Sequence, residues 1–98
     1  MVQDRREQIL LERKANIRGK RLRAVGTLMV TPKRLSFRPL SREKKINIPL
    51  DSIQQICVVG LVFKKLRIVT KQRIFTLYVK GAENVANLLH TLQLNMVS

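Results

Sequence analysis

Apolar and polar residues alternate over long parts of this chain, with the period of two that is typical of β-strands with one buried face. The clearest run covers residues 22–30, and its inward face is predicted to carry Leu22, Ala24, Gly26, Leu28 and Val30. Thr31-Pro32 ends this run because proline has no N–H to donate to a strand ladder. The alternation resumes with Leu35 and Phe37, which predicts a strand, a tight turn and a second strand.

The same alternation predicts further strands joined by short connections. A first strand is predicted at residues 7–17, although Leu10 beside Leu11 blurs its pattern, and Gly19 marks the turn that follows. Later strands are predicted at residues 45–49, 53–59, 64–70 and 74–80. The connections are predicted to be a polar loop at residues 39–45, a corner at residues 50–53 and a hairpin connection at residues 70–73.

The period changes to that of a helix after Gly81. Apolar residues then fall at i, i+3, i+4 and i+7, the stripe of a helix that packs one face on a core: Val85, Leu88, Leu89 and Leu92. The helix is predicted to run for about 12 to 14 residues. Seven short strands followed by one helix favour a mainly β domain that a terminal helix closes.

Length and charge narrow the classes of function. The 98 residues suffice for a single modest core, so we expect one domain over residues 1–98. Twenty Lys and Arg face six Asp and Glu, a net charge of +14. A field of this sign attracts phosphate-rich partners such as anionic lipid head groups, nucleic acid or polyphosphate. The alternative is a solvated surface that self-repulsion keeps soluble.

The sequence predicts a cytoplasmic protein whose contact with a membrane is peripheral, at its inner face. No apolar stretch approaches the roughly 20 residues that span a bilayer. The first residues lack the apolar core of a signal peptide. Cys57 is the only cysteine, which excludes an internal disulfide and suits a reducing compartment.

No group of residues suggests catalysis. His90, the only histidine, lies beside the apolar helix stripe, and Cys57 lies mid-strand, where we expect a buried, inert thiol. The six acidic residues are scattered, and no metal-spaced cluster or glycine-rich phosphate loop is present. We therefore expect no catalytic residue, no metal site and no cofactor, and a binding protein rather than an enzyme.

Four stretches, in this order, resemble the GRAM branch of the pleckstrin-homology-like superfamily. "GTLMVTPKRLSF" at residues 26–37 resembles the family's Gly-x-Leu-x-Leu-Thr-x-x-Arg-Leu-x-Phe signature, with Val30 in place of the second Leu. "KINIPLDSIQQI", "LRIVTKQRIFTLYV" and "ENVANLLHTL" resemble the next block, the late hairpin and the closing helix. The resemblance covers about residues 7–94.

This resemblance implies a β-sandwich or partly open barrel of about seven antiparallel strands in two nearly orthogonal sheets, capped by a C-terminal helix. Members of the family are usually lipid-binding or protein-binding modules and are not enzymes. The chain contains no Trp, whereas the closing helix of pleckstrin-homology domains proper typically carries one. The resemblance therefore favours the GRAM branch.

Many basic residues fall in connections that the topology should bring together. Every second turn of consecutive antiparallel hairpins lies at the same end of a sheet, so residues 18–21 should neighbour residues 39–45. The resemblance adds residues 70–73 to this rim, whereas Lys33 and Arg34 belong at the opposite end and should contribute little. The predicted anion-binding residues are Lys14, Arg18, Lys20, Arg21, Arg23, Arg42, Lys44, Lys45, Lys71 and Arg73.

Three of these residues also resemble the Lys-x(n)-Arg-x-Arg arrangement with which many pleckstrin-homology domains hold inositol phosphates. They are Lys14, Arg21 and Arg23. Arg21 and Arg23 are two apart on a predicted strand, so their side chains would project from one face. The alternative is a merely solvated outer strand face.

The sequence does not favour specific nucleic-acid recognition, because aromatic residues are few and the helix carries no Lys or Arg. Protein binding at an exposed strand edge stays open. The apolar trio Leu61-Val62-Phe63 could insert at a membrane interface, meet a partner or cover an edge of the core, and we expect the last. We predict a module that binds acidic phospholipid or phosphoinositide head groups, with a protein partner as the alternative and non-specific nucleic-acid binding third.

Overall fold

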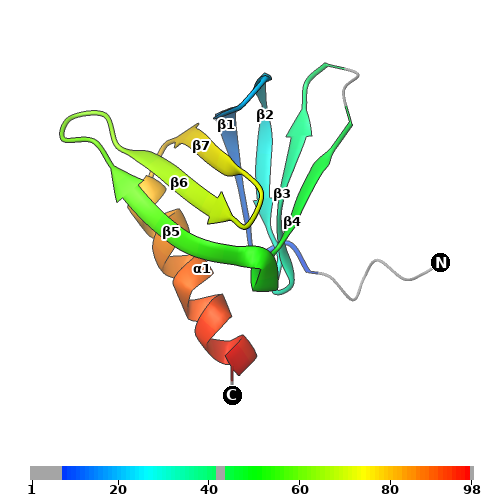
Figure 1. Cartoon of the computed structure of the whole chain (residues 1–98), viewed down its shortest axis with the longest axis vertical. Coiled ribbons are helices and arrows are strands. Elements are labelled where there is room, and N and C mark those ends of the chain that lie inside the picture. The colour runs from blue at the N-terminus through cyan, green and yellow to red at the C-terminus, as the bar shows by residue number, and fades with distance from the viewer. Residues whose placement is uncertain (1–7, 42–43, 98) are drawn as a thin grey trace.

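The computed structural model describes residues 8–41 and 44–97, which form one antiparallel sheet and one helix (Figure 1). The seven described strands are hydrogen-bonded in the order β4-β3-β2-β1-β7-β6-β5. They are β1 (Leu11–Gly19), β2 (Leu22–Val30), β3 (Arg34–Pro39), β4 (Ile46–Pro49), β5 (Ile53–Val59), β6 (Lys65–Thr70) and β7 (Ile74–Val79). A 3-10 turn, η2 (Leu50–Ser52), separates β4 from β5, and the helix α1 (Ala82–Val97) follows β7.

Strand β1 joins two halves of the sheet. It pairs with β2 along its whole length and with β7 over residues 15–18. The sheet curls around one core and leaves an open side between β4 and the half made of β5, β6 and β7 (Figure 1). The predicted mainly β fold of antiparallel strands with a C-terminal helix is confirmed, and its two sheets are the halves of one hydrogen-bonded sheet.

The inward face predicted from the alternation is buried or partly buried, and Met29, on the other face of β2, is buried as well. Leu28 and Val30 of β2 are fully buried, and Leu22 and Ala24 are partly buried against the same core. Gly26 lies where β3 comes closest, since a Cβ there would sit 2.1 Å from the Arg38 carbonyl oxygen. The other strands contribute Ala15, Ile17, Leu35, Phe37, Ile48, Ile53, Ile56, Leu66, Ile68, Phe75, Leu77 and Val79 to the core.

The predicted limits of the first strand are wrong. Strand β1 begins at Leu11 and ends at Gly19, and Ile9 and Leu10 are exposed. The partner strand decides where β1 begins, because β2 ends at Val30, which pairs with Leu11. Before Leu11, only the Leu10 N–H still bonds to β2, at the Val30 carbonyl and 2.7 Å. Glu7, the predicted start, lies outside the described residues.

Two turns of the sheet use the same threonine geometry. Thr31 and Thr70 each donate the backbone N–H to the carbonyl of the Arg three residues later, at 2.9 and 2.8 Å. Each Thr Oγ1 also accepts the N–H of that residue, Arg34 or Arg73, at 3.1 Å. The side chain thus closes the turn, which explains how the hairpin at residues 70–73 forms without glycine.

The helix is longer than predicted, at 16 residues. Its predicted stripe is buried at Val85 and Leu89 and partly buried at Leu88 and Leu92, against β5, β6 and η2. Gln93 Nε2 donates to the Leu50 and Ile53 carbonyls, both at 3.1 Å. No glycine or proline follows Leu92, so the sequence contains nothing that would end the helix there.

Candidate anion-binding surface

Three connections carry exposed cations at one edge of the sheet. The β1–β2 turn and the described ends of the β3–β4 loop lie together at the top of Figure 1. The β6–β7 turn lies beside the β1–β2 turn, because both line one open depression of about 980 Å³. We call this set the basic edge, and its described members are Lys20, Arg21, Lys44, Lys45, Lys71 and Arg73, all exposed. Arg42, also predicted for this site, lies outside the described residues.

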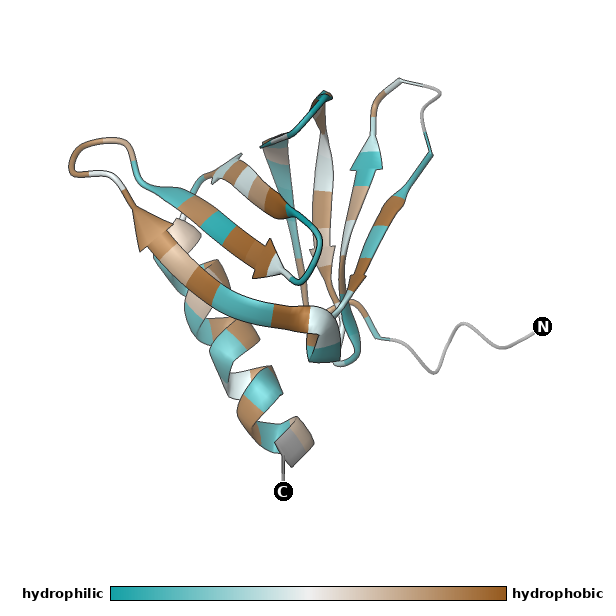
Figure 2. Cartoon of the chain, viewed as in Figure 1, coloured by the Kyte–Doolittle hydropathy of each residue, from teal (hydrophilic) through white to brown (hydrophobic). Residues whose placement is uncertain are grey.

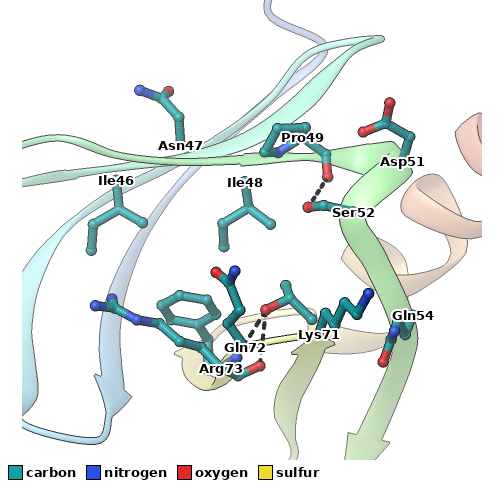
Figure 3. Close-up of a pocket in the computed structure, with 12 residues that line it drawn as sticks. Ile46, Asn47, Ile48, Pro49, Asp51, Ser52, Gln54, Lys71, Gln72 and Arg73 are labelled. Atoms are coloured by element: carbon teal, nitrogen blue, oxygen red, sulfur yellow. Dashed lines mark hydrogen bonds between the residues drawn. The ribbon is translucent and has the colours of Figure 1, made fainter.

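A second depression, of about 580 Å³, lies between β4 and the β6–β7 turn (Figure 3). In Figure 3, Ile46 and Ile48 point across it toward the β6–β7 turn, and Asn47 points away. Lys71 and Arg73 contribute its positive charge, so the β6–β7 turn borders both depressions. Four cations of the basic edge therefore border open hollows that a phosphate-bearing head group could enter, although the Asp51 carboxylate also lines the second hollow.

The three residues of the predicted Lys-x(n)-Arg-x-Arg arrangement lie on β1, in the β1–β2 turn and on β2. Arg21 lies in the β1–β2 turn with φ 60°, not on β2 as predicted, so it does not share a strand face with Arg23. Lys14 is paired with Thr27 across β1 and β2 and precedes Arg18 by four residues. At about 3.3 Å per residue it lies roughly 16 Å from Gly19, the last residue of the strand. Arg18 rather than Lys14 is the cation next to Gly19, where β1 ends.

The outer face of the sheet gathers a second set of cations. Arg18 is paired with Arg23 on β2 and with Thr76 on β7, and Thr76 is paired with Arg67 on β6. The guanidinium of Arg18 and the ammonium of Lys65 lie 5.3 and 5.4 Å from the centre of the Tyr78 ring. We call Arg18, Arg23, Lys65 and Arg67 the outer basic face.

Like charges in adjacent strands repel one another unless something neutralises them. The only ion pair between described residues joins Lys64 to Glu83, at 2.7 Å, and none involves the outer basic face. A bound anion would therefore lower the energy of this face. Lys65 and Arg67 were not predicted as site residues, although their alternation with the buried Leu66 and Ile68 points them outward.

The turn at residues 31–34 lies at the opposite edge, as expected. Figure 1 shows the β2–β3 turn at the other end of the sheet from the β1–β2 turn. The Lys33 carbonyl accepts the Leu50 N–H at 3.0 Å, which holds this turn beside η2. Arg34 is only partly exposed. This pair of cations is thus separated from the basic edge.

The residues with catalytic potential are not brought together. His90 is exposed on α1, with Nε2 3.2 Å from the Ile56 carbonyl oxygen. Cys57 is half-buried rather than buried as predicted, because its neighbour Ile56 takes the inward position on β5. Among residues 8–41 and 44–97, no three His, Cys, Asp or Glu side chains could share a metal ion. Nor is any helix in this part of the chain long and apolar enough to cross a membrane.

The predicted burial of Leu61-Val62-Phe63 is wrong. These side chains are 96%, 80% and 82% exposed, in the loop between β5 and β6. They follow the last pair of the β5–β6 ladder, Val59 with Lys65, and do not belong to the core cluster. The loop therefore projects beyond the sheet.

Comparison with known proteins supports the fold and no more. No family model and no curated protein sequence matches the chain. The crystal structure of the C-terminal domain of an unknown protein from Leishmania infantum matches with a TM-score of 0.77 and 20% identity, over 92% of this chain and 87% of that one. The solution structure of the N-terminal PH domain of the human ARAP2 protein matches with a TM-score of 0.62 and 23% identity, over 97% and 82%. The fold is thus pleckstrin-homology-like.

Proposed function

We propose that this protein is a non-enzymatic module that docks reversibly on the anionic, cytoplasmic face of a membrane. Its ligand is an acidic phospholipid or phosphoinositide head group, and the basic edge is the contact surface. The observation that carries the proposal is that two basic connections, the β1–β2 and β6–β7 turns, line open depressions at the end of the sheet where the β3–β4 loop also lies. The pleckstrin-homology-like fold, which often serves binding, supports it. From the resemblance of the four stretches, we propose that the chain belongs to the GRAM branch.

The expected affinity follows from the number of cations. A Lys or Arg near an anionic leaflet contributes about 1 kcal/mol, so the six described cations of the basic edge would give roughly 6 kcal/mol at most. This limit corresponds to a dissociation constant no tighter than about 40 μM. Such binding is reversible and falls as salt rises.

Nucleic acid is a weaker candidate. Phe37 and Phe75 are buried in the core, and the partly buried Tyr78 lies between two cations, so the outer face offers no row of rings for bases to stack on. The helix α1 contains no Lys or Arg to follow a phosphate backbone. Non-specific binding at low salt is still expected.

A protein partner is the second candidate, and one observation favours it. Among the described strands, β4 pairs only with β3, so its other edge faces the depression of Figure 3. An extended segment could add to this edge and place acidic side chains near Lys71 and Arg73. In that case the protein would bind the partner and not vesicles.

Co-sedimentation with vesicles tests the proposal. At near-physiological salt, the protein should bind vesicles that contain phosphatidylserine or a phosphoinositide and should leave phosphatidylcholine vesicles unbound. Vesicles of matched charge distinguish recognition of a specific head group from attraction to surface charge. A DNA competitor tests for non-specific nucleic-acid binding. Binding to neither vesicle type would contradict the proposal and favour the protein partner.

A further inference from the structure

The loop between β5 and β6 presents three contiguous apolar side chains to solvent. Leu61, Val62 and Phe63 form the apolar loop, which projects as a brown segment from the ends of β5 and β6 (Figure 2). Single exposed apolar residues are common on soluble proteins, but a contiguous exposed group marks a surface of interaction. The proposed docking on the basic edge leaves this loop without a role.

The backbone holds the apolar loop in its outward position. Gly60 begins the loop with φ 105°, a conformation that residues with a side chain rarely adopt. A Cβ at Gly60 would lie 2.4 Å from the Phe63 carbonyl oxygen. The chain therefore turns tightly at Gly60 and returns to β6, and this turn directs the intervening side chains away from the sheet.

Cations lie beside the apolar loop on the side of β6 and β7. Lys64 and Lys65 follow it directly, and a depression of about 520 Å³ separates it from Lys80 at the end of β7. The register that pairs Ala15 with Val79 also brings the exposed Lys14 to the Lys80 end of β7. The nearby carboxylate of Glu83 is paired with Lys64.

We propose that the apolar loop inserts into the interface of an anionic membrane while Lys65, Lys80 and Lys14 lie at the level of the head groups. This inference rests on the proposed function and extends its contact surface. The combination of an apolar tip with a neighbouring set of cations complements a bilayer in which anionic head groups cover acyl chains. The outer basic face connects the two regions, since Arg18 adjoins the β1–β2 turn and Lys65 adjoins the apolar loop.

A tryptophan reporter tests the insertion directly, because the chain contains no Trp. The variant Phe63→Trp places one at the tip, and Leu94→Trp places one at an exposed position of α1. On phosphatidylcholine vesicles that contain phosphatidylserine, the emission of the Phe63→Trp variant should shift to shorter wavelength and resist a water-soluble quencher. The Leu94→Trp variant should show neither change.

A matched pair of substitutions measures the contribution to binding. Leu61→Ser should weaken vesicle binding about tenfold, whereas Leu94→Ser should leave it nearly unchanged. This loss should persist as salt rises, because burial of an apolar side chain is not screened.

The outcomes separate this inference from the proposed function. If the protein co-sediments with anionic vesicles but the tip Trp stays quenchable, insertion is wrong and docking on the basic edge stands. If wild-type protein binds no vesicle, both are wrong. If the tip Trp is already blue-shifted without vesicles, in proportion to protein concentration, a second copy of the chain covers the loop and the inference is overturned.

Discussion

The substitution Leu89→Ala tests how α1 is held on the sheet. Leu89 is fully buried between α1 and the strands, at 0% exposure. Truncation of a fully buried Leu costs about 2 to 5 kcal/mol, because apolar contact is lost and a cavity remains. Leu88, the next residue, is only partly buried against the core. Leu88→Ala should therefore cost about 1 to 2 kcal/mol.

Urea unfolding followed by circular dichroism measures both free energies of unfolding. A domain of this size has a free energy of unfolding of about 5 to 15 kcal/mol. The losses expected for Leu89→Ala and Leu88→Ala are large fractions of that total and can be compared by urea unfolding. Leu94→Ala is the control, since this side chain is 72% exposed and its loss should change stability by less than about 0.5 kcal/mol. Equal losses for Leu88→Ala and Leu89→Ala, or a Leu89→Ala variant as stable as the control, would refute the packing described for α1.

Two further predictions concern the turns of the basic edge. Thr70→Val should lower the free energy of unfolding by about 1 kcal/mol, because Oγ1 both accepts the Arg73 N–H and donates to the Arg73 carbonyl. Thr70→Ser should preserve the stability, and thermal unfolding of both variants decides this. Arg21→Gly should raise the free energy of unfolding by roughly 0.5 to 1 kcal/mol, since Arg21 has φ 60°. A loss of stability on urea unfolding would mean that the Arg21 side chain makes stabilising contacts.

Much of the fold could be predicted because it depends on local pattern. The alternation at residues 22–30 and the helical stripe from Val85 to Leu92 identify the buried faces, and the structure buries or partly buries them. The start of the first strand could not be read in this way. Residues 9–11 are all apolar, and only the length of the partner strand decides which of them pair.

The candidate surface was less predictable because it depends on contacts between distant strands. The outer basic face exists because β1 pairs with β7, which places Arg18 and Arg67 on the two sides of Thr76. No local pattern contains that register. The apolar loop was misjudged for another reason, since apolar residues are usually buried, and only the three-dimensional path from Gly60 to Lys65 reveals that these are not.

Vesicle binding by two charge-matched double variants tests the central claim most directly. Lys20→Gln with Arg73→Gln removes two cations from the basic edge. Arg13→Gln with Lys33→Gln removes two exposed cations from the opposite end of the sheet, where Arg13 pairs with Leu28 and Lys33 adjoins η2. At about 1 kcal/mol per cation, the first variant should bind phosphatidylserine-containing vesicles roughly 30-fold more weakly, and the second should lose less than about threefold. Equal losses would contradict the account, because they would mean that net charge binds the membrane and that the basic edge has no special part.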